Sequence, residues 1–363
     1  MKIGIDVSQA VYGTGVSDYT IDLVRALKTV DPTNRYVLFG TSLRRHNDLK
    51  KLFRNARLFR LPPMLLYYLW NYFHIINIEN FIGDVDVFHS SDWAEPPAAA
   101  PKVTTVHDLS PFLFPDEMAS GAFRNISSVH QARMNWVVRE CAKIICVSRS
   151  TADDLMKLFR VNPGRIAVIP EAMPARFHLR PAASEIIRQK TRFGLHDYII
   201  SIGTPQPRKN IPLLVNSFLH FQKILRLPEK LVIVGGRGWG ITDIPDDPRI
   251  IFTGFLPDLE LAALLKGAQV LAYPSLYEGF GLPILMAFFH QIPVLTSDLS
   301  SMPEVAGDGA VLVDPKNGEA IAYGLARAIK DKSALIRAGL ERLKQYSWEQ
   351  TARETLMVYS SLC

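Results

Sequence analysis

Short runs of apolar, often β-branched residues recur along the whole chain, and longer segments with a helical spacing of apolar residues lie between many of them. Most of the short runs are continuously apolar, as is typical of parallel strands covered on both faces. They predict strands at 3–7, 36–39, 57–61, 85–89, 103–107, 143–147, 166–169, 198–202, 231–234, 250–252, 270–273, 293–296 and 311–313. The helical spacing predicts helices at 16–29, 119–141, 150–159, 212–225, 258–268, 283–290 and 318–329. Strand and helix therefore alternate twice over, which indicates two α/β domains.

The alternation is interrupted after Ile169-Pro170, where prolines and polar residues continue through Ala183 and no element is predicted before Tyr198. Such a stretch is typical of a linker. We predict an N-terminal domain at 1–175, a second domain at 176–345 and a terminal segment at 346–363, whose helix after Trp348 crosses back to the first domain. Doubly wound sheets bind ligands at the carboxyl ends of their strands, so we expect two Rossmann-like domains facing across a ligand-binding cleft.

Composition supports two globular domains, because 363 residues exceed one ordinary doubly wound domain and 48% of them are hydrophobic. The net charge of +6 suits phosphate-rich small molecules or an anionic membrane surface, although a surplus of Lys and Arg without function explains the charge as well. No nucleic-acid motif is present, so we expect no nucleic-acid partner. Cys141, Cys146 and Cys363 have neither zinc-site nor disulfide-framework spacing.

Residues 44–80 join a basic stretch to an aromatic, leucine-rich one. The apolar part, 61–79, is too polar to span a bilayer, because spanning needs about 20 predominantly apolar residues. We predict peripheral membrane contact through 44–80; the alternative is a solvated helix face followed by a buried helix. Because Met1 opens directly into a strand, we expect no signal peptide and a cytoplasmic location. If 44–80 binds lipid, the chain lies on the inner face of the cell membrane.

Two loops carry the charges that suggest chemistry. Gly203 follows a predicted strand, and Arg208-Lys209 then stand just before a helix, which suits a diphosphate but is also compatible with an exposed basic pair. Further on, PSLYEGFGLP at 274–283 places Glu278 among glycines at the start of a helix. Glycines let backbone N–H groups approach an anion, and a carboxylate accepts hydrogen bonds from sugar hydroxyls.

At this point the sequence resembles the family 4 retaining glycosyltransferases of the GT-B fold, most closely mannosyltransferase-like members that build bacterial surface polysaccharide. The matching segments follow one another in family order over nearly the whole chain. They lie at 5–6, 13–15, 87–89, 105–109, 208–210, 231–236, 252–254, 274–283, 301–308 and 347–349.

The resemblance implies that the chain is a hexosyltransferase using a nucleotide diphosphate sugar, expected to be GDP-mannose, and a glycan or lipid-linked acceptor. It assigns catalysis to His107, Arg208, Lys209 and Glu278. It assigns donor or acceptor binding to Gly13, Gly15, Gly203, Gly254, Phe255, Leu256, Gly279, Phe280, Gly281, Leu282 and Met286. No metal and no cofactor are expected, since no DxD motif is placed for a metal and the GT-B family generally needs none.

Met286 departs from the family pattern, which has a second glutamate there that holds the ribose hydroxyls. A thioether is a weak acceptor, and losing one charge-assisted hydrogen bond costs about 1.5–3 kcal/mol. Donor binding is therefore weakened or rebuilt, or the chain is a GT-B relative that has lost transfer. Since no residue decides the base, a UDP- or ADP-sugar donor is the alternative to GDP-mannose. Glu171-Ala172 is a smaller departure from the asparagine-glycine pair of the family, and His89 is either an acceptor contact or a structural histidine at a strand end.

Overall fold

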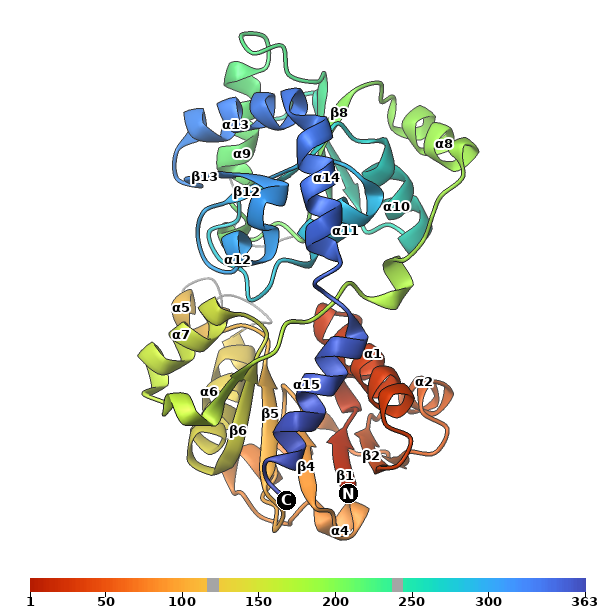
Figure 1. The fold of residues 1–363 in the computed structure, drawn as a ribbon, viewed down its shortest axis with the longest axis vertical. Coiled ribbons are helices and arrows are strands. Elements are labelled where there is room, and N and C mark those ends of the chain that lie inside the picture. Colours follow the sequence, from red (N-terminus) through yellow and green to blue (C-terminus); the bar gives the residue numbers. More distant parts are fainter. Residues whose placement is uncertain (116–123, 237–243) are drawn as a thin grey trace. The chain divides into compact units, whose positions relative to one another are not determined.

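The computed structural model describes residues 1–115, 124–236 and 244–363, and these form two compact units. The first unit comprises Met1–Glu171 together with Ser347–Cys363, and the second comprises Ala172–Tyr346. The predicted boundary after residue 175 thus falls inside the second unit, a few residues past the observed division. The terminal helix α15 (Trp348–Ser360) belongs to the first unit, where it packs against α1 (Gly15–Val30; Figure 1).

The described part of the first unit contains a seven-stranded parallel sheet in the order β3-β2-β1-β4-β5-β6-β7. Its strands are β1 (Lys2–Asp6), β2 (Arg35–Thr41), β3 (Arg57–Phe59), β4 (Val87–Ser90), β5 (Lys102–Val106), β6 (Cys141–Cys146) and β7 (Ile166–Val168). The helices and single turns are η1 (Ser8–Val11), α1, α2 (His46–Leu52), α3 (Pro63–Leu66), the π-helix η2 (Tyr67–Tyr72), α4 (Glu79–Ile82), α5 (Ser110–Leu113), α6 (Arg124–Glu140), α7 (Arg149–Phe159), η5 (Pro163–Arg165) and α15.

The second unit has, among its described residues, a six-stranded parallel sheet in the order β10-β9-β8-β11-β12-β13. The strands are β8 (Tyr198–Ile202), β9 (Lys230–Val234), β10 (Ile250–Gly254), β11 (Val270–Tyr273), β12 (Val294–Ser297) and β13 (Ala310–Val313). The helices are η6 (Ala175–Phe177), α8 (Ala183–Phe193), η7 (Pro207–Lys209), α9 (Ile211–Phe221), α10 (Asp258–Gly267), α11 (Leu282–His290), α12 (Met302–Ala306), η8 (Gly307–Gly309), α13 (Gly318–Lys330) and α14 (Lys332–Leu343).

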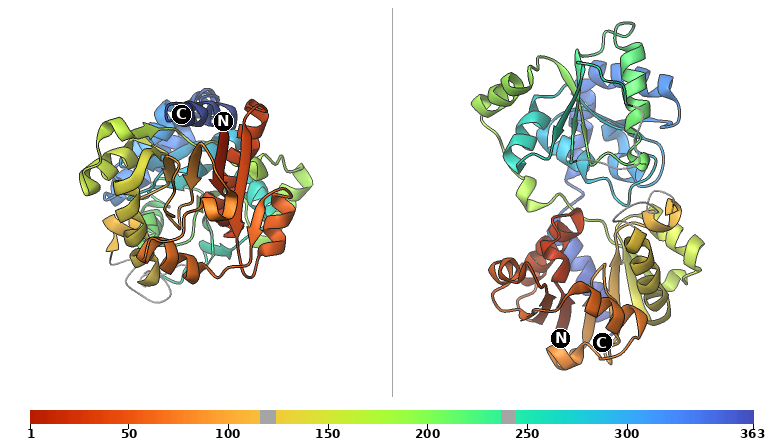
Figure 2. Two further views of the ribbon diagram at one scale, coloured as in Figure 1. Left: turned by 90° about the horizontal axis from the view of Figure 1, so that it is seen from below. Right: turned by 180° about the vertical axis from the view of Figure 1, so that it is seen from behind.

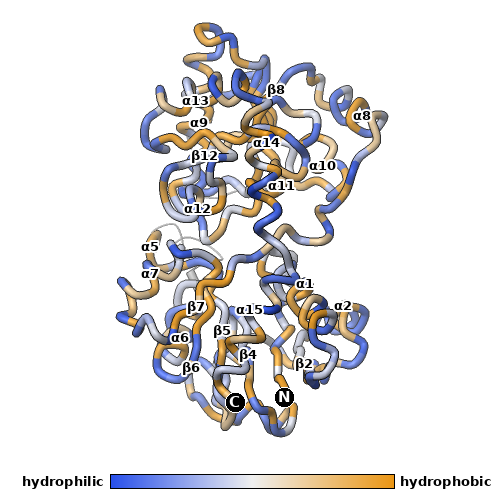
Figure 3. Tube along the Cα trace, in the orientation of Figure 1, coloured by the Kyte–Doolittle hydropathy of each residue, from blue (hydrophilic) through white to orange (hydrophobic). Residues whose placement is uncertain are grey.

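Helices cover both faces of each sheet, as the reversal of strand order in a doubly wound fold requires (Figures 1 and 2). In the second unit, Leu214 and Phe218 of α9 are fully buried and pack in one cluster with Ile321 and Leu325 of α13. The four-residue spacing within each pair places both side chains on one face of the helix. Hydrophobic residues accordingly concentrate on the central strands, and hydrophilic residues on outer loops and helix faces (Figure 3).

Several helices were not predicted from the sequence, and α8 and α14 are the longest of them. The stretch expected to be irregular up to Tyr198 contains α8 (Ala183–Phe193), which is capped by Gly194 in the left-handed conformation that glycine favours. The helix was missed because most of its residues are polar, and of its described residues only Gln189 is buried. The helix expected at 119–141 is α6, and the first part of that range lies outside the described residues.

Candidate functional site

The strand order of the second unit reverses between β8 and β11, which are neighbours in the sheet although β9 and β10 separate them in sequence. Arg208 and Lys209 lie in the turn η7 after β8, and Glu278 lies in the loop after β11. Ligands of doubly wound sheets bind at such a reversal, outside the carboxyl ends of the strands. The fold therefore brings the two charged loops singled out from the sequence to one place.

The three side chains contact one another directly. Lys209 Nζ lies 2.5 Å from Glu278 Oε1, and Arg208 Nη1 lies 2.9 Å from Glu278 Oε2. Arg208 Nη1 also donates to the Tyr277 carbonyl oxygen at 3.1 Å. The side chains are 8–12% exposed, so the ion pairs form in a largely desolvated pocket where electrostatic interactions are strong.

The charge state of Glu278 follows from these neighbours. Burial alone would raise the pKa of its carboxyl group, but the Lys209 ammonium and the Arg208 guanidinium outweigh burial and lower the pKa to about 2. Glu278 is therefore ionised at neutral pH and can only accept hydrogen bonds. A ligand hydroxyl that reaches it acts as the donor.

Tyr273, the last residue of β11, is a member of this cluster that the sequence analysis did not identify. Lys209 Nζ donates to its hydroxyl oxygen at 3.0 Å, and the ammonium also lies over its ring. Burial raises the pKa of Tyr273 well above its ordinary value, and the Glu278 carboxylate acts in the same direction. The phenol thus stays neutral and helps to fix Lys209.

Two serines in the loop after β12 hold the turn that carries Glu278. Ser300 Oγ donates to the Glu278 carbonyl oxygen at 2.7 Å, and Ser301 Oγ donates to the carbonyl oxygens of Glu278 and Phe280 at 2.9 and 2.8 Å. Asn210 joins two further loops, since its amide nitrogen donates to the carbonyls of Pro274 and Pro315. No periodic pattern marks these residues, because their role is a loop-to-loop contact between distant parts of the sequence.

Glycines at the same sheet edge allow close approaches. Gly203 follows β8 with φ +140°, and Lys209 passes over it, so an added Cβ would lie 3.4 Å from Lys209 Cε. Gly281 adopts φ +104° as the cap of α11, and Leu282 begins that helix with Pro283 in its first turn. Gly279 and the buried Phe280 complete the turn between Glu278 and α11, where Phe280 packs edge-on against Tyr346.

Met286 lies on α11 and is buried, with 3% of its surface exposed. Gly254 ends β10 at φ +72°, followed by Phe255, which is 80% exposed, and Leu256, which is buried. Since β9 and β10 are parallel to β8, Gly254 lies at the same sheet edge as Gly203. An exposed aromatic ring at this edge is available to a planar ligand group.

His107 follows β5 in the first unit and is closely packed. Its ring contacts Tyr19 edge-on at 4.6 Å between centroids, and Tyr19 in turn contacts Trp348 of α15. Burial lowers the pKa of His107, against the Asp92 and Asp108 carboxylates, so the ring is neutral at pH 7. His107 Nε2 is buried and has no hydrogen-bond partner among the described residues. An unpaired buried ring nitrogen suits a group that bonds to a ligand.

Gly13 and Gly15 precede and begin α1, and Gly13 adopts φ +76° with its N–H donating to Ser17 Oγ at 3.0 Å. His89, by contrast, is buried in β4 with both ring nitrogens occupied, Nδ1 by the Tyr359 hydroxyl at 2.6 Å and Nε2 by Thr105 Oγ1 at 3.0 Å. Burial lowers the pKa of His89 to about 3. Of the two interpretations offered for His89, the structure supports the structural one.

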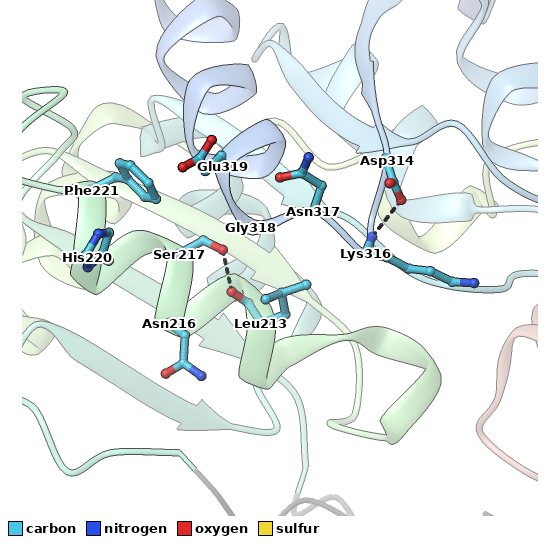
Figure 4. Close-up of a pocket in the computed structure, with 10 residues that line it drawn as sticks. All are labelled: Leu213, Asn216, Ser217, His220, Phe221, Asp314, Lys316, Asn317, Gly318 and Glu319. Carbon is cyan, nitrogen blue, oxygen red and sulfur yellow. Dashed lines mark hydrogen bonds between the residues drawn. The ribbon is translucent and has the colours of Figure 1, made fainter.

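The second unit also carries a surface groove of about 650 Å³ between α9 and the start of α13. Figure 4 shows its lining side chains, with the Lys316 N–H donating to Asp314 and Ser217 Oγ donating to the Leu213 carbonyl oxygen. None of the residues implicated by the sequence lines this groove. In the parts of the chain that the structure describes, no group of three or more His, Cys, Asp and Glu side chains is arranged to hold a metal ion.

Two family profiles match the chain: Glycosyltransferase Family 4 over residues 13–175, and Glycosyl transferases group 1 over residues 183–349. A relative from Escherichia coli, O-antigen chain mannosyltransferase B, is 30% identical over 288 residues, which cover 76% of this chain and 74% of the relative. The chain belongs to the family 4 glycosyltransferases. O-antigen chain mannosyltransferase RfbU of Salmonella typhimurium is 25% identical over 322 residues, covering 84% of each chain. The family and the glycosyltransferase activity expected from the sequence are thereby confirmed.

Solved structures of glycosyltransferases share the fold. Sucrose-phosphate synthase from Thermosynechococcus elongatus superposes with a TM-score of 0.71 at 17% identity, covering 100% of this chain and 99% of the other. HepE from Anabaena, solved in complex with UDP-glucose, superposes with a TM-score of 0.70 at 16% identity, covering 100% of both chains. The predicted fold class, two Rossmann-like doubly wound domains of the GT-B type, is confirmed.

Proposed function

We propose that this glycosyltransferase transfers mannose from GDP-mannose to a glycan or lipid-linked acceptor with retention of anomeric configuration. The observation that carries the proposal is the buried contact of Arg208 and Lys209 with Glu278 at the strand-order reversal of the second unit. The choice of mannose is supported by the names of the two O-antigen mannosyltransferases to which the chain is similar.

Breaking the bond between sugar and pyrophosphate creates negative charge on the leaving group. In the proposed reaction Arg208 and Lys209 turn from Glu278 to that pyrophosphate, and the backbone N–H groups at the start of α11 after Gly281 bind it as well. Glu278 then accepts hydrogen bonds from donor-sugar hydroxyls. Removing one preorganised charge-stabilising group of this kind typically slows a reaction by about 10²–10³-fold.

Other residues have supporting roles in the proposal. The neutral ring of His107 bonds to the transferred sugar near its reacting carbon, and Gly13 and Gly15 shape a loop that contacts phosphate or acceptor. The segment Gly254, Phe255 and Leu256 lies against the nucleotide base. Because two cations already neutralise the leaving group, transfer needs no metal ion.

A panel of nucleotide sugars tests the donor. We expect GDP-mannose to raise the melting temperature of the chain and to yield a mannosylated product by mass spectrometry, undiminished in EDTA. A ligand present at 100 times its Kd stabilises a protein by about 2.7 kcal/mol, which is readily detected. Stabilisation and transfer with UDP-glucose or ADP-glucose in place of GDP-mannose would show that the donor is wrongly identified.

We propose in addition that residues 44–80 contact an anionic membrane surface. Seven side chains there present basic groups to solvent, and the following segment exposes apolar ones. The basic residues are Arg44, Arg45, Lys50, Lys51, Arg54, Arg57 and Arg60, and the exposed apolar ones are Met64, Leu65, Tyr68, Tyr72, Phe73, Ile75 and Ile76. Basic groups beside exposed aromatic residues are typical of surfaces that bind lipid headgroups. Among the helices of the described ranges, none has both the length and the apolar composition that crossing a bilayer requires.

His74 fixes the exposed apolar segment to the body of the first unit. Its ring stacks on Trp136 at 3.6 Å, its Nε2 lies 2.9 Å from Glu140 Oε1, and its Nδ1 bonds to the Trp70 carbonyl oxygen. We expect the chain to sediment with phosphatidylglycerol vesicles but not with phosphatidylcholine vesicles, and replacement of Tyr72 and Phe73 by Ser to release it. Equal sedimentation of wild type and variant would remove the segment from the proposal.

A further inference from the structure

The surface groove between α9 and the start of α13 lies outside the charged cluster of the second unit (Figure 4). Its volume of about 650 Å³ falls within the range of about 300–1,000 Å³ that is typical of sites for small ligands. Gly318 lets the two helices approach closely at the base of the groove, because an added Cβ there would lie 2.9 Å from Ser217 Oγ. The groove is therefore a feature that the sequence of both helices creates.

The two walls of the groove are held together by the core beneath it. Leu214 and Phe218 of α9 pack in one buried cluster with Ile321 and Leu325 of α13. Helices joined in this way keep their spacing whether or not a ligand is present. A preformed groove lowers the entropy cost of binding, so it suits a ligand that makes only moderate contacts.

Polar groups of both walls are available to a ligand. The exposed side chain of Asn216 makes no hydrogen bond to any described residue. Asn317 caps α13 with its Oδ1, which accepts from the Ala320 N–H at 3.1 Å, and its amide nitrogen bonds to nothing in the described ranges. Ser217 Oγ donates to the Leu213 carbonyl oxygen and can still accept. Groups that both donate and accept match ligand hydroxyls, which do the same.

An aromatic ring lies beside these polar groups. Phe221 of α9 lines the groove and is half-buried, and its ring centroid lies 5.9 Å from that of Tyr323 of α13. Tyr323 is 55% exposed. The apolar face of a pyranose ring stacks on aromatic rings, while its hydroxyls reach the polar groups around them.

The charges of the groove argue against an anionic ligand. Asp314 and Glu319 contribute carboxylates, whereas the Lys316 side chain extends away from α9 and α13 (Figure 4). A phosphate would therefore meet repulsion there. A metal ion is equally unsuited, since the described residues contain no group of three or more His, Cys, Asp and Glu side chains arranged to hold one. A neutral, polyhydroxylated ligand agrees with all of these features.

The groove adjoins the loop that carries the charged cluster. Helix α9, one wall of the groove, begins directly after Arg208, Lys209 and Asn210. The Asn210 amide nitrogen donates to the Pro315 carbonyl oxygen at 2.6 Å, and Pro315 belongs to the segment that leads into α13. A ligand in the groove is thus held on the same part of the second unit as the proposed pyrophosphate site.

We propose that this groove binds a neutral oligosaccharide, namely a part of the glycan acceptor remote from its reacting end. The inference rests on the proposed function, because that function supplies the glycan. Asn216, Asn317 and Glu319 bond to sugar hydroxyls, and Phe221 stacks on a pyranose face. A second attachment of this kind raises the effective concentration of the reacting end, so long acceptors are favoured over short ones.

Binding of linear α-mannotetraose, measured by saturation-transfer difference NMR and calorimetry, tests the groove. We expect about tenfold weaker binding for the double variant Asn216→Ala/Glu319→Ala, whose two side chains are exposed, so that its melting temperature should stay that of wild type. Phe221→Leu keeps an apolar side chain but loses the stacking face, and about threefold weaker binding is expected. The control is Glu229→Ala, which removes an exposed carboxylate of the same unit outside the groove.

Acceptor length separates a glycan-holding role from a structural one. In the double variant we expect the KM for a mannan octasaccharide to rise about fivefold, while the KM for methyl α-mannoside and the stabilisation by GDP-mannose stay unchanged. Wild-type values for both tetraose binding and octasaccharide KM in that variant would overturn the groove. So would a wild-type chain that is stabilised by GDP-mannose but does not bind the tetraose. A chain that binds the tetraose in the groove but is not stabilised by GDP-mannose would instead overturn the proposed donor.

Discussion

The two units have the same kind of sheet with strand order reversed near its middle, yet the side chains at the two reversal points are opposite in character. In the second unit the loops after β8 and β11 bring together Arg208, Lys209 and Glu278. In the first unit the segments after β1 and β4 bring together Tyr12 and Trp93 beside Asp92. The fold thus supplies two equivalent positions, and the loop residues decide the chemical character of each.

Two buried glutamates also differ, because their neighbouring charges shift their pKa values in opposite directions. Glu278 and Glu171 are both 6% exposed, and burial raises the pKa of each. At Glu278 the neighbouring cations outweigh burial, and its pKa falls to about 2. At Glu171 the Asp18 carboxylate adds to burial, and its pKa rises to about 8. One is an ionised ligand group at neutral pH, and the other is largely protonated.

The comparison predicts its largest effect at the charged reversal point. We expect Lys209→Ala or Glu278→Ala to reduce kcat for transfer by about 10³-fold while the chain stays folded. Lys209→Ala removes a cation that holds the departing pyrophosphate, and Glu278→Ala removes the carboxylate that accepts hydrogen bonds from the donor sugar. Steady-state kinetics and circular dichroism measure the two effects. Lys316→Ala, at an exposed lysine of the same unit, serves as the control. Full activity in both site variants would refute the site.

In the first unit we expect a smaller effect, at His107 after β5. We expect His107→Ala to lower kcat by about 10²-fold, because one hydrogen bond to the sugar is lost and no charge is removed. Since burial lowers the pKa of His107 from its ordinary value of 6.5, protonation of this ring should not reduce the wild-type rate between pH 7 and 8. A rate that falls on acidification in wild type, but not in His107→Ala, would contradict a neutral histidine.

The raised pKa of Glu171 should make the stability of the folded chain depend on pH. Its pKa of about 8 in the folded chain exceeds the ordinary value of 4.5, so the folded state binds more protons between these values. The contribution of Glu171 to stability is therefore largest below pH 4.5 and is lost as pH rises toward and past 8. We expect Glu171→Gln to be more stable than wild type at pH 8.5 by about 1–3 kcal/mol, measured by urea unfolding.

The exposed Glu229→Gln is the matched control for that measurement and should change the pH dependence little. A wild-type chain and a Glu171→Gln variant with parallel stability curves from pH 5 to 8.5 would show that Glu171 is ionised like an ordinary glutamate.

We expect the smallest effect from a substitution at Met286, which should change the affinity for GDP. A glutamate at this position would add one charge-assisted hydrogen bond to the ribose, so we expect Met286→Glu to tighten GDP binding about tenfold by calorimetry. Because Met286 is buried, the new carboxylate should also lower the melting temperature of the free chain. Met286→Leu should change neither quantity. Unchanged GDP affinity in Met286→Glu would mean that other groups hold the ribose.

The sequence by itself determined the elements and the family. Each strand of the two sheets was predicted within a few residues of its ends, because strands buried on both faces are marked by continuous apolar runs such as 198–202 and 270–273. The local patterns around Arg208-Lys209 and Glu278 also identified the charged loops, since glycines, prolines and charges at the ends of strands are visible in sequence. Helices such as α8 were not found, because their residues are mostly polar and few of them are buried.

Only the tertiary structure decided which of these residues meet. Glu278 lies 69 positions from Lys209, and no spacing rule predicts the 2.5 Å contact between them. The sequence also did not identify three further members of the site, Tyr273, Ser300 and Ser301. Their hydrogen bonds connect loops that only the strand order brings together. The protonation states of His89 and Glu171 also depend on the tertiary structure. Burial and neighbouring groups set their pKa values, and neither can be read from the local sequence.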